Sequence, residues 1–517
     1  MARRDPRGAI GPAPIPLLLA VAAGALHTLA YVHTHAWALQ MLAVALLAML
    51  ASRAPPRRAA LIGLLFGMAW LVAGTWWLFV SMHRYGGLPA WMAALAVLGL
   101  SAFLSLYLAA AMASFAAWRR GTPAADALLL AALWLLAELA RGVIFTGFPW
   151  VASGYAHVDG PLAQLAAWVG VYGLGAVAAG ISAWVGLAAL EASGASRRIV
   201  PVLASAGLLL VLAWMPVVQF TQPTGSLSVR LLQGNVPQDE KFEVTQQASA
   251  LEWHLRGLTE ARGDLVVAPE TAIPFLPQQM PEGVWSALQE RFSSGPTAAM
   301  LGVPLGDDVQ GYTNSAVAFA PGKPAMYRYD KQHLVPFGEF IPWGFRWFTE
   351  MMNIPLGDFN RGLLVAPSFA WKGERIGPNI CYEDLFGEEL AARYGEGGDA
   401  PTILANLSNI GWFGETSAVA QHLQISRMRT LELQRPMLRA TNTGATVVID
   451  HQGRVTHALA PYTRGVLDAT VQGRQGLTPF VRWAAAFGLW PPALLAMAIV
   501  AAFVATSLAG PRARRHA

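Results

Sequence analysis

The sequence predicts a polytopic α-helical membrane domain joined to an α/β soluble domain. Charged residues make up 13% of the 517 residues, about half of the usual share, while 55% are apolar. Of the 31 acidic residues, 26 lie between Leu227 and Phe480, together with all four lysines. In that stretch alone, short apolar runs alternate with helical patterns. The chain is therefore apolar, then of ordinary soluble composition, then apolar again, and a wholly soluble protein is excluded.

The apolar parts divide into eight expected transmembrane helices. A bilayer core about 30 Å thick takes roughly 20 mostly apolar residues per helix, and arginine-containing loops cut the apolar stretches near that length. The expected spans run from Ile15 to Tyr31, Ala36 to Leu50, Leu61 to Phe79, Leu88 to Phe115, Ala125 to Leu139, Leu162 to Leu190, Val200 to Val218, and Trp483 to Leu508. They define a domain of residues 1–219 with seven spans, a domain of residues 220–480, and residues 481–517 with the eighth span and a basic tail.

Arginines set the expected orientation, because short cytoplasmic loops retain Lys and Arg while translocated short loops are depleted of them. The arginine clusters are Arg3, Arg4 and Arg7; Arg53, Arg57 and Arg58; Arg119 and Arg120; Arg197 and Arg198; Arg512, Arg514 and Arg515. With eight spans they all fall on one side, so we expect both termini in the cytoplasm and residues 220–480 outside it. A cleaved signal peptide is the alternative for the basic N-terminus, and the even number of spans argues against it.

Two charged residues stand near the outer end of the fifth span. Glu138 and Arg141 are three residues apart, a spacing that places both on one face of a helix. Ionisable residues in or near a membrane are candidates for a functional role. A mutually satisfied ion pair at the interface explains the two residues equally well, and both interpretations stay open.

The charged block has the pattern of an α/β domain. Apolar runs predict strands at residues 227–234, 264–268, 298–303, 316–320, 375–380, 402–407 and 445–449. Helical patterns occupy residues 246–262, 282–292, 385–394 and 418–434. In such folds the loops at the carboxyl ends of strands hold the chemistry. Glu270 and Cys381 each stand just after one of these runs, and Lys331 follows a further strand end, Tyr327 to Asp330.

Cys381 is the single cysteine of the chain, so it can form neither an internal disulfide nor a thiolate metal site. A lone cysteine is usually a small buried hydrophobe, but the strand that ends at Cys381 and its polar neighbours favour a nucleophile. A thiol with a pKa of about 8.5 needs a partner that takes its proton. Glu270 is better placed for this than His333 or His422, although a strand-terminal glutamate alone is more often a cap or an ion-pair partner.

Three motifs in this order closely resemble the Glu-Lys-Cys signature of the nitrilase, or carbon–nitrogen hydrolase, superfamily. They are Pro269-Glu270, the run Lys331-Gln332-His333-Leu334-Val335-Pro336-Phe337-Gly338-Glu339, and Asn379-Ile380-Cys381-Tyr382-Glu383. The second motif, set inside a polytopic membrane protein, is similar to that of the apolipoprotein N-acyltransferase family. Further matches are Gly147-Phe148-Pro149-Trp150, Gly154-Tyr155, Gln233-Gly234-Asn235, Trp412-Phe413-Gly414, the run from Gln421 to Arg435, and Arg439 to Gly444.

The resemblance implies a nitrilase-like αββα sandwich on the periplasmic side of the bacterial inner membrane. It implies that an acyl chain moves from a phospholipid, with the sn-1 chain of phosphatidylethanolamine expected, through a cysteine thioester to the N-terminal amine of an S-diacylglyceryl-cysteine lipoprotein. The implied catalytic residues are Glu270 as base, Lys331 as oxyanion partner and Cys381 as nucleophile. Glu339, Tyr382, Glu383 and Trp412 are implied to support them or to bind substrate. Two positions depart from the family pattern: Phe242 replaces an expected tryptophan, and Ile410 stands where an acidic residue is common.

An apolar segment between Lys331 and Cys381 is a candidate lid. A thioester needs shielding from water, and a lipid should reach the sulfur directly from the bilayer. Aromatic and methionine side chains suit such an interface. The candidates are Trp343, Trp347, Phe348 and Met351. Ordinary core packing of a surface helix explains the same pattern.

Two other classes of function fit parts of the sequence. A membrane-tethered amidase or nitrilase acting on small amides would share the first half of the chemistry, but would need a closed polar pocket instead of a lipid-sized groove. A transporter is disfavoured because the spans hold few charges and no paired half-length segments. No metal motif or nucleotide-binding loop occurs, so we expect no metal, no cofactor and no nucleic-acid partner.

Overall fold

The computed structural model describes residues 14–191, 195–238, 244–349 and 358–509, which form two compact units. The helical unit contains the described residues of Met1–Trp76, Ala94–Val217 and Leu489–Ala517. The sandwich unit contains those of Trp77–Ala93 and Val218–Gly488. The segment Trp77–Ala93 therefore packs with the second unit, although it lies between two apolar helices in the sequence.

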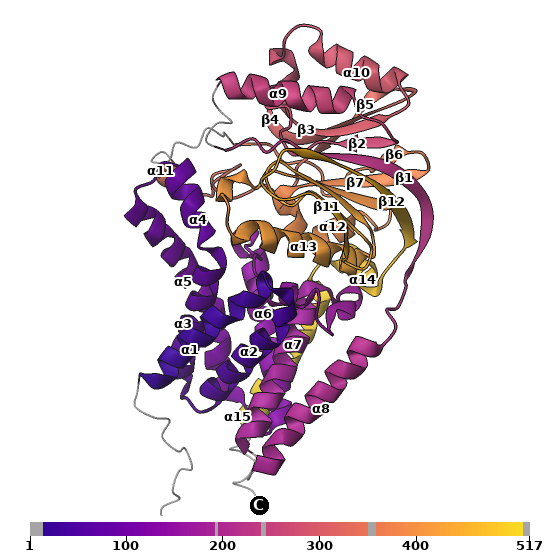
Figure 1. Ribbon diagram of the computed structural model, residues 1–517. Helices are drawn as coiled ribbons and strands as arrows, with labels where there is room; N and C mark the ends of the chain where they lie inside the picture. Colours follow the sequence, from indigo (N-terminus) through magenta and orange to yellow (C-terminus); the bar gives the residue numbers. More distant parts are fainter. Residues whose placement is uncertain (1–13, 192–194, 239–243, 350–357, 510–517) are drawn as a thin grey trace, which may run out of the picture. The chain divides into compact units, whose positions relative to one another are not determined.

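Apolar helices build the helical unit (Figure 1). They are α1 (Ile15–His27), α2 (Trp37–Ser52), α3 (Pro56–Thr75), α5 (Ala90–Trp118), α6 (Pro123–Val143), α7 (Ala166–Glu191), α8 (Ala195–Trp214) and α15 (Trp490–Ala509). Large apolar side chains on these helices, such as those of Leu18, Leu95 and Leu203, are more than half exposed. A helix that satisfies its own backbone groups and presents apolar side chains outward is what a bilayer requires.

Six of the eight expected spans are confirmed as helices that are long and apolar enough to cross a bilayer. They are Thr34–Ser52, Pro56–Thr75, Ala90–Trp118, Pro123–Thr146, Ala163–Glu191 and Trp490–Leu508. The first and seventh expected spans are apolar helices, Ile15–Tyr31 and Ile199–Trp214, but shorter than 18 residues. The described residues therefore establish six such helices and do not establish eight. The last one begins at Trp490 instead of Trp483, because α14 (Pro479–Phe487) belongs to the sandwich unit.

Glu138 and Arg141 form a buried ion pair on α6. Nη2 of Arg141 lies 3.3 Å from Oε1 of Glu138, and Nη1 of Arg141 donates to the carbonyls of Phe148 and Trp150, at 3.1 and 2.6 Å. Glu138 accepts the backbone N–H and the hydroxyl of Ser153, at 2.7 and 2.6 Å. The two charges thus satisfy each other and also hold the loop that follows α6, which favours the interpretation as a mutually satisfied pair.

Two six-stranded sheets form the sandwich unit. Their orders are β12-β1-β2-β3-β4-β5 and β11-β10-β9-β8-β7-β6. The strands are β1 (Thr221–Gln233), β2 (Leu265–Val267), β3 (Ala298–Asp307), β4 (Gly311–Ala320), β5 (Lys323–Asp330), β6 (Phe369–Trp371), β7 (Glu374–Ile380), β8 (Ile403–Ser408), β9 (Met437–Thr441), β10 (Val447–Ile449), β11 (Val455–Ala458) and β12 (Gly465–Gly476). Strands β1 to β3 are parallel, as are β7 to β9, and the outer strands pair antiparallel.

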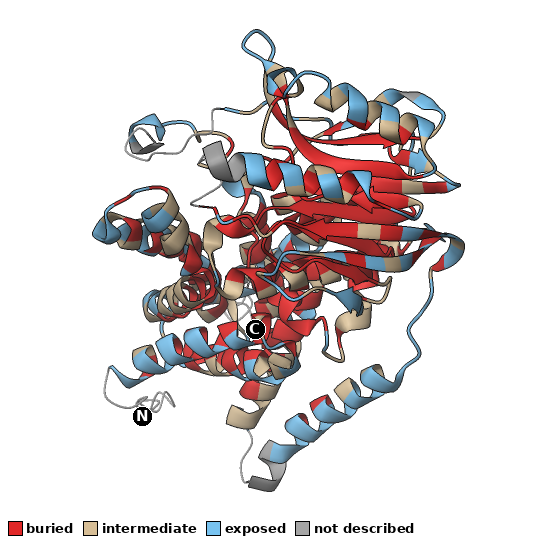
Figure 2. Ribbon diagram, turned by 45° about the horizontal axis from the view of Figure 1, so that its top comes forward, coloured by how far each residue is buried: buried red, intermediate tan, exposed pale blue. Residues whose placement is uncertain are grey.

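A single apolar core lies between the two sheets. Leu231 and Val267 of the first sheet share one buried cluster with Ile376 and Leu407 of the second. Helices α9 (Val244–Thr259) and α10 (Val284–Ser294) cover the other face of the first sheet, and α12 (Gly387–Ala392) and α13 (Ser417–Leu433) lie against the second (Figure 1). Figure 2 shows buried strands under helices whose outer faces are exposed. The unit is therefore an αββα sandwich, as the resemblance implied.

The predicted strands all coincide with observed ones, because the central strands are covered on both faces and their sequences are continuously apolar. Only the last residues of β5, Tyr327 to Asp330, were identified, and strands β6, β9, β11 and β12 were not predicted. β6 has three residues, β11 is exposed along its whole length, and β12 alternates exposed with buried residues. The helix predicted at 385–394 is confirmed as the shorter α12, which follows a 3₁₀ helix, η8 (Cys381–Leu385).

The segment Trp77–Ala93 contacts the rest of the sandwich unit through aromatic side chains. It begins with α4 (Trp77–Val80) and a π-helical turn, η3 (Ser81–Tyr85). Nε1 of Trp77 donates to Oε1 of Gln421 on α13 at 3.0 Å, and the Trp77 ring lies 4.3 Å from that of Phe413. Trp77 therefore packs against α13 and Phe413, which lie far from it in the chain.

Candidate active site

Glu270, Lys331 and Cys381 lie at strand ends in the sandwich unit. Glu270 follows β2, Lys331 directly follows β5 and Cys381 directly follows β7. Because β4 reverses the direction of β3 and β5 reverses it again, β2 and β5 end at the same edge of their sheet. Gly302 on β3 lets the loop of Glu270 approach, since a Cβ at Gly302 would come within 2.6 Å of the Glu270 Cα. Cys381 interacts electrostatically with both Glu270 and Lys331, so the ends of the two sheets meet here.

A buried ion cluster surrounds Asn314 of β4. Nζ of Lys331 donates to Oε1 of Glu339 at 2.9 Å and lies 3.5 Å from Oε1 of Glu270. Nδ2 of Asn314 donates to the same two carboxylate oxygens, at 2.7 Å each. The other oxygen of Glu270 accepts the backbone N–H of Asn409 at 2.8 Å. One ammonium and one amide therefore hold two buried carboxylates in fixed positions.

The surrounding carboxylates keep Lys331 protonated. Burial by itself would lower the pKa of a lysine, but the negative charges of Glu339 and Glu270 outweigh it and raise the pKa of Lys331 above its ordinary value. Its loop is fixed as well, because the second oxygen of Glu339 accepts the backbone N–H of Val335 at 2.8 Å. Lys331 can therefore serve as a fixed cation and not as a base.

Cys381 occupies a left-handed turn at the start of η8. Its φ is +51°, a conformation that costs a residue with a side chain roughly 1–3 kcal/mol. Burial and the negative charge of Glu270 raise the pKa of the Cys381 thiol to about 12, and Lys331 offsets only part of this. The thiol therefore keeps its proton at neutral pH, and removal of that proton has to accompany attack on a substrate.

Glu383 joins the lysine loop to the cysteine turn. Its carboxylate accepts the backbone N–H of Gln332 at 2.7 Å and that of Ile380 at 2.6 Å. The hydroxyl of Tyr329 donates to both of its oxygens, at 2.9 and 2.8 Å. Gln332 directly follows the lysine and Ile380 directly precedes the cysteine. A single buried side chain thus fixes two segments that come from different sheets.

Tyr382 and Trp412 lie on the two loops next to the cluster. Tyr382 is buried, and its ring lies 5.4 Å from that of Phe386. Trp412 belongs to the 3₁₀ turn η9 (Gly411–Phe413), and its ring meets that of Tyr85 edge-on at 6.2 Å. Ile410, which replaces a commonly acidic residue, is buried. Phe242 lies outside the described residues.

Both histidines that the sequence offered as possible bases contact other groups. Nδ1 of His333 lies 2.9 Å from Oε1 of Glu389, and its ring stacks on Phe386. Nε2 of His422 lies 3.2 Å from the carbonyl oxygen of Cys381. These contacts agree with the choice of Glu270 over a histidine as the proton acceptor.

The candidate lid is described only in part. Trp343 is 98% exposed and Trp347 is 61% exposed. Core packing therefore does not account for these two tryptophans. The side chain of Phe348 and the whole of Met351 lie outside the described residues.

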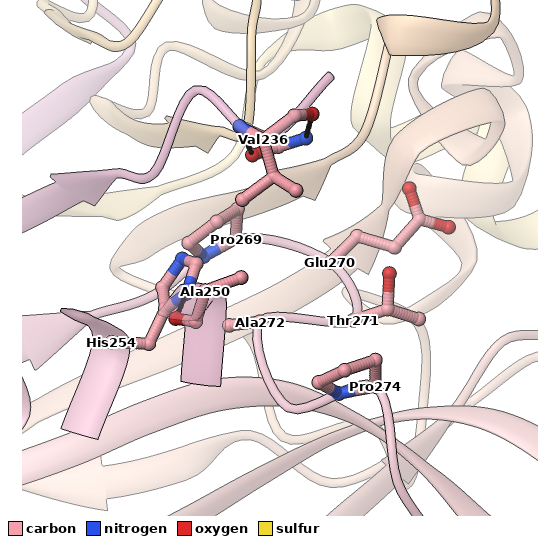
Figure 3. A pocket seen from close by; sticks show the side chains of 9 residues that line it. Val236, Ala250, His254, Pro269, Glu270, Thr271, Ala272 and Pro274 are labelled. Atoms are coloured by element: carbon pink, nitrogen blue, oxygen red, sulfur yellow. Dashed lines mark hydrogen bonds between the residues drawn. The ribbon is translucent and has the colours of Figure 1, made fainter. Parts of the chain in front are cut away.

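A pocket opens beside Glu270 (Figure 3). It is lined by Val236, Ala250, His254, Pro269, Glu270, Thr271, Ala272, Pro274 and Asn442. The carboxylate of Glu270 and the ring of His254 lie at opposite ends of it, with Pro269 between them. Glu270, although buried, therefore lines a small pocket on this side.

Asn314 and Asn409 are site residues that sequence reasoning missed. Asn314 lies in the polar stretch Tyr312-Thr313-Asn314-Ser315 of a strand, where only its inward, buried position marks it. Asn409 acts through its backbone N–H, which any residue type could supply. Neither could have been found without the pairing of the strands.

Comparison with known proteins defines first the class of the sandwich unit. Residues 228–479 match the family model "Carbon-nitrogen hydrolase". A carbon–nitrogen hydrolase of Helicobacter pylori G27 is 18% identical in sequence, with a TM-score of 0.34, over 52% of this chain and 93% of that one. By its match to the family model, the sandwich unit is a carbon–nitrogen hydrolase domain.

The remaining comparisons concern the helical unit and most of the chain. Residues 23–184 match the model "Apolipoprotein N-acyltransferase N-terminal domain". Proteins named apolipoprotein N-acyltransferase are 53% identical in Verminephrobacter eiseniae, over 88% of this chain and 89% of that protein, and 49% identical in Ralstonia nicotianae, over 93% and 92%. The chain belongs to the apolipoprotein N-acyltransferase family.

Proposed function

We propose that this protein is an N-acyltransferase that moves an acyl chain from a membrane phospholipid to the N-terminal amine of S-diacylglyceryl-cysteine lipoproteins. The observation that carries the proposal is the group formed by the buried Glu270 and Lys331 with the partly buried Cys381, in a chain whose other unit contains helices long and apolar enough to cross a membrane. The names of the relatives support the same activity.

The first half of the reaction forms a thioester. Glu270 takes the proton of Cys381 as the sulfur attacks the ester carbonyl of the phospholipid, for which we propose the sn-1 chain of phosphatidylethanolamine. The sulfur–carbon bond forms, the carbon–oxygen ester bond breaks, and the leaving oxygen takes the proton from Glu270. The products are an acyl-enzyme and a lysophospholipid. The high thiol pKa supports a proton transfer that is coupled to the attack.

The second half transfers the acyl chain to nitrogen. The neutral α-amino group of the lipoprotein attacks the thioester carbonyl, and Glu270 takes the proton that the nitrogen loses. The carbon–sulfur bond breaks, and the sulfur recovers its proton from Glu270. The amide product leaves, and Cys381 returns to its starting state.

Lys331 and the backbone N–H of Tyr382 would stabilise the oxyanion of both tetrahedral intermediates. Loss of one such donor typically costs about 100- to 1000-fold in rate. Two sets of contacts support this role. Lys331 contacts Glu339, and Asn314 donates to the carboxylates of both Glu270 and Glu339, so the ammonium and its carboxylate partners keep their positions during the reaction. Glu383 would maintain the spacing of the two loops, and Trp412 would contact substrate.

We also propose the placement of the protein in the cell. Residues 220–480 would face the periplasm, with the spans in residues 1–219 and 481–517 in the inner membrane and both termini in the cytoplasm. Lipid would enter past Trp343 and Trp347, whose exposure supports an interfacial role, together with Phe348 and Met351.

An acyl adduct on Cys381 is the decisive observation. Purified full-length protein is incubated with phosphatidylethanolamine, and its intact mass is measured. We expect one added acyl chain, absent in Cys381→Ser and strongly reduced in Glu270→Gln. Glu260→Gln, which changes an exposed carboxylate at the end of α9, is the matched control and should behave like the unchanged protein.

The same experiment separates the alternative functions. No adduct on the unchanged protein, or an adduct that persists in Cys381→Ser, would overturn the mechanism. Ammonia release from small amides without acyl transfer from phospholipid would instead favour a membrane-tethered amidase.

A further inference from the structure

We propose that His422 and Asn406 clamp the carbonyl oxygen of Cys381, and that Arg439 holds His422 in the form that can do so. The clamp would orient the peptide that contains the N–H of Tyr382. It rests on the proposed function, because it assigns these residues to the positioning of the oxyanion donor.

Two buried side chains converge on the Cys381 carbonyl. Nε2 of His422 on α13 lies 3.2 Å from this oxygen, and Nδ2 of Asn406 on β8 donates to it at 3.4 Å. A carbonyl oxygen can only accept a hydrogen bond, so Nε2 of His422 must carry a proton. Both side chains are fully buried.

Arg439 on β9 decides which nitrogen of His422 is protonated. Nη2 of Arg439 lies 2.8 Å from Nδ1 of His422. A guanidinium can only donate, so Nδ1 must accept and the ring is the neutral Nε2–H tautomer. Burial and the positive charge of Arg439 also lower the pKa of His422 well below its ordinary value. His422 is therefore fixed as a donor toward Cys381 and does not titrate in the physiological range.

Buried partners hold the guanidinium of Arg439 in turn. Nε of Arg439 donates to the carbonyl of Ala445 at 3.1 Å, and Nη1 donates to the hydroxyl of Ser426 and lies 3.5 Å from Oδ2 of Asp384. The hydroxyl of Ser426 donates to that same oxygen of Asp384. Arg439, Ser426 and Asp384 are all inaccessible to solvent. The network thus connects α13, β9 and η8 beneath the nucleophile.

The geometry of the peptide plane explains how the clamp would orient the N–H of Tyr382. The carbonyl of Cys381 and the N–H of Tyr382 belong to one peptide, and no cis peptide occurs among the described residues, so the two bonds point in opposite directions. The φ of +51° at Cys381 is a conformation that the backbone does not favour by itself. Fixing the oxygen on one side therefore aims the N–H at the other side. His422, Asn406 and Arg439 are thus positioning residues.

The test uses a reaction that needs the oxyanion donor and one that does not. The full-length protein reacts with a p-nitrophenyl ester, and the burst of nitrophenolate gives the kcat and KM of acylation. Separately, iodoacetamide alkylates the thiol without forming an oxyanion. For His422→Phe we expect the kcat of acylation to fall about 10- to 100-fold, with KM and the alkylation rate within about twofold. His422→Gln keeps an N–H donor and should recover most of the acylation.

Control variants separate the clamp from a general effect on folding. His457→Phe changes an exposed histidine on β11 and should leave both reactions unchanged. Arg439→Lys, which cannot serve both His422 and Ser426, should resemble His422→Phe. Normal acylation in His422→Phe would overturn the proposal, as would an equal loss of acylation and alkylation in both His422→Phe and His422→Gln. Because the ester is not a phospholipid, a protein that reacts with it but takes no acyl chain from phosphatidylethanolamine would contradict only the proposed function.

Discussion

Single residues in this site serve several partners at once. Nδ2 of Asn314 donates to two carboxylates, and Nζ of Lys331 contacts the same two oxygens. Hydrogen bonds to buried charged groups contribute about 1.5–3 kcal/mol each. A change at one of these residues should therefore disturb both Glu270 and Glu339.

Asn314→Ala should slow acyl-adduct formation about 10- to 100-fold and lower the melting temperature, because two carboxylates each lose a donor worth about 1.5–3 kcal/mol. Asn314→Asp should be more harmful, since it adds a third carboxylate beside two buried ones. Intact-mass kinetics and thermal unfolding measure both effects. Asn360→Ala removes an exposed amide and serves as control. An Asn314→Ala protein with full activity would contradict this role.

The rate at which Cys381 reacts with an alkylating agent should increase with pH. With a thiol pKa raised to about 12, the thiolate fraction rises about tenfold per pH unit up to that value. In the absence of lipid, iodoacetamide should therefore modify Cys381 at pH 8 about a thousandfold more slowly than a free cysteine of pKa about 8.5. Alkylation rates between pH 7 and 11, followed by mass spectrometry, test this. A plateau at or below pH 8.5 would show that the thiol is not perturbed as described.

Residues carried by a local motif could be predicted, and residues that act through tertiary contacts could not. Cys381 directly follows the apolar strand β7, Glu270 comes shortly after the apolar strand β2, and Lys331 begins a recognisable motif directly after β5, so all three could be identified from the sequence. The contact of Arg439 with His422 and that of Asn314 with Glu270 depend on how α13, β9 and β4 pack. No spacing in the chain encodes those contacts.

At the scale of elements, two loops and one turn form the site, and Glu383 joins them. The central parallel strands were predictable because both of their faces are buried. β12 was not predicted, because it pairs with β1 over a long separation and leaves half of its residues exposed. The division of the expected helix 385–394 follows from Phe386, whose φ of −109° and ψ of 80° end η8 before α12 begins.

The exposed tryptophans of the candidate lid should matter for lipid and not for stability. Combined Trp343→Ser and Trp347→Ser should slow acylation by phosphatidylethanolamine vesicles more than tenfold, while exposed substitutions usually change stability by no more than about 0.5 kcal/mol. Acylation by a soluble p-nitrophenyl ester should be nearly unaffected. Val309→Ser, at another apolar residue that is 94% exposed, is the matched control. If acylation by the vesicles and acylation by the soluble ester slowed equally, the two tryptophans would have no lipid-specific role.

At the scale of the whole molecule, the arginine pattern sets the expected topology. In a Cys381→Ser background, a single new cysteine reports the side of the membrane, because the chain has no other thiol. Val309→Cys should react with a membrane-impermeant maleimide in cells with a permeabilised outer membrane. Arg57→Cys, on an exposed residue in the first turn of α3, should react only after the inner membrane is broken. The reverse labelling pattern would invert the proposed orientation.

Composition separated the apolar and charged parts of the chain but could not assign the segment Trp77–Ala93. This segment belongs to the sandwich unit because Trp77 bonds Gln421, 344 residues further along. A hydropathy pattern contains no information about such a pairing.

That pairing bears on how such proteins can evolve and be recombined. A gene fragment that begins at residue 218 encodes every strand of the sandwich unit but omits the aromatic segment that meets α13 and η9. Residues from 218 onward therefore do not contain the whole sandwich unit. Exchanges between relatives should succeed when the crossover points transfer both pieces from one parent, and chimaeras that mix parents between them should inherit mismatched aromatic partners.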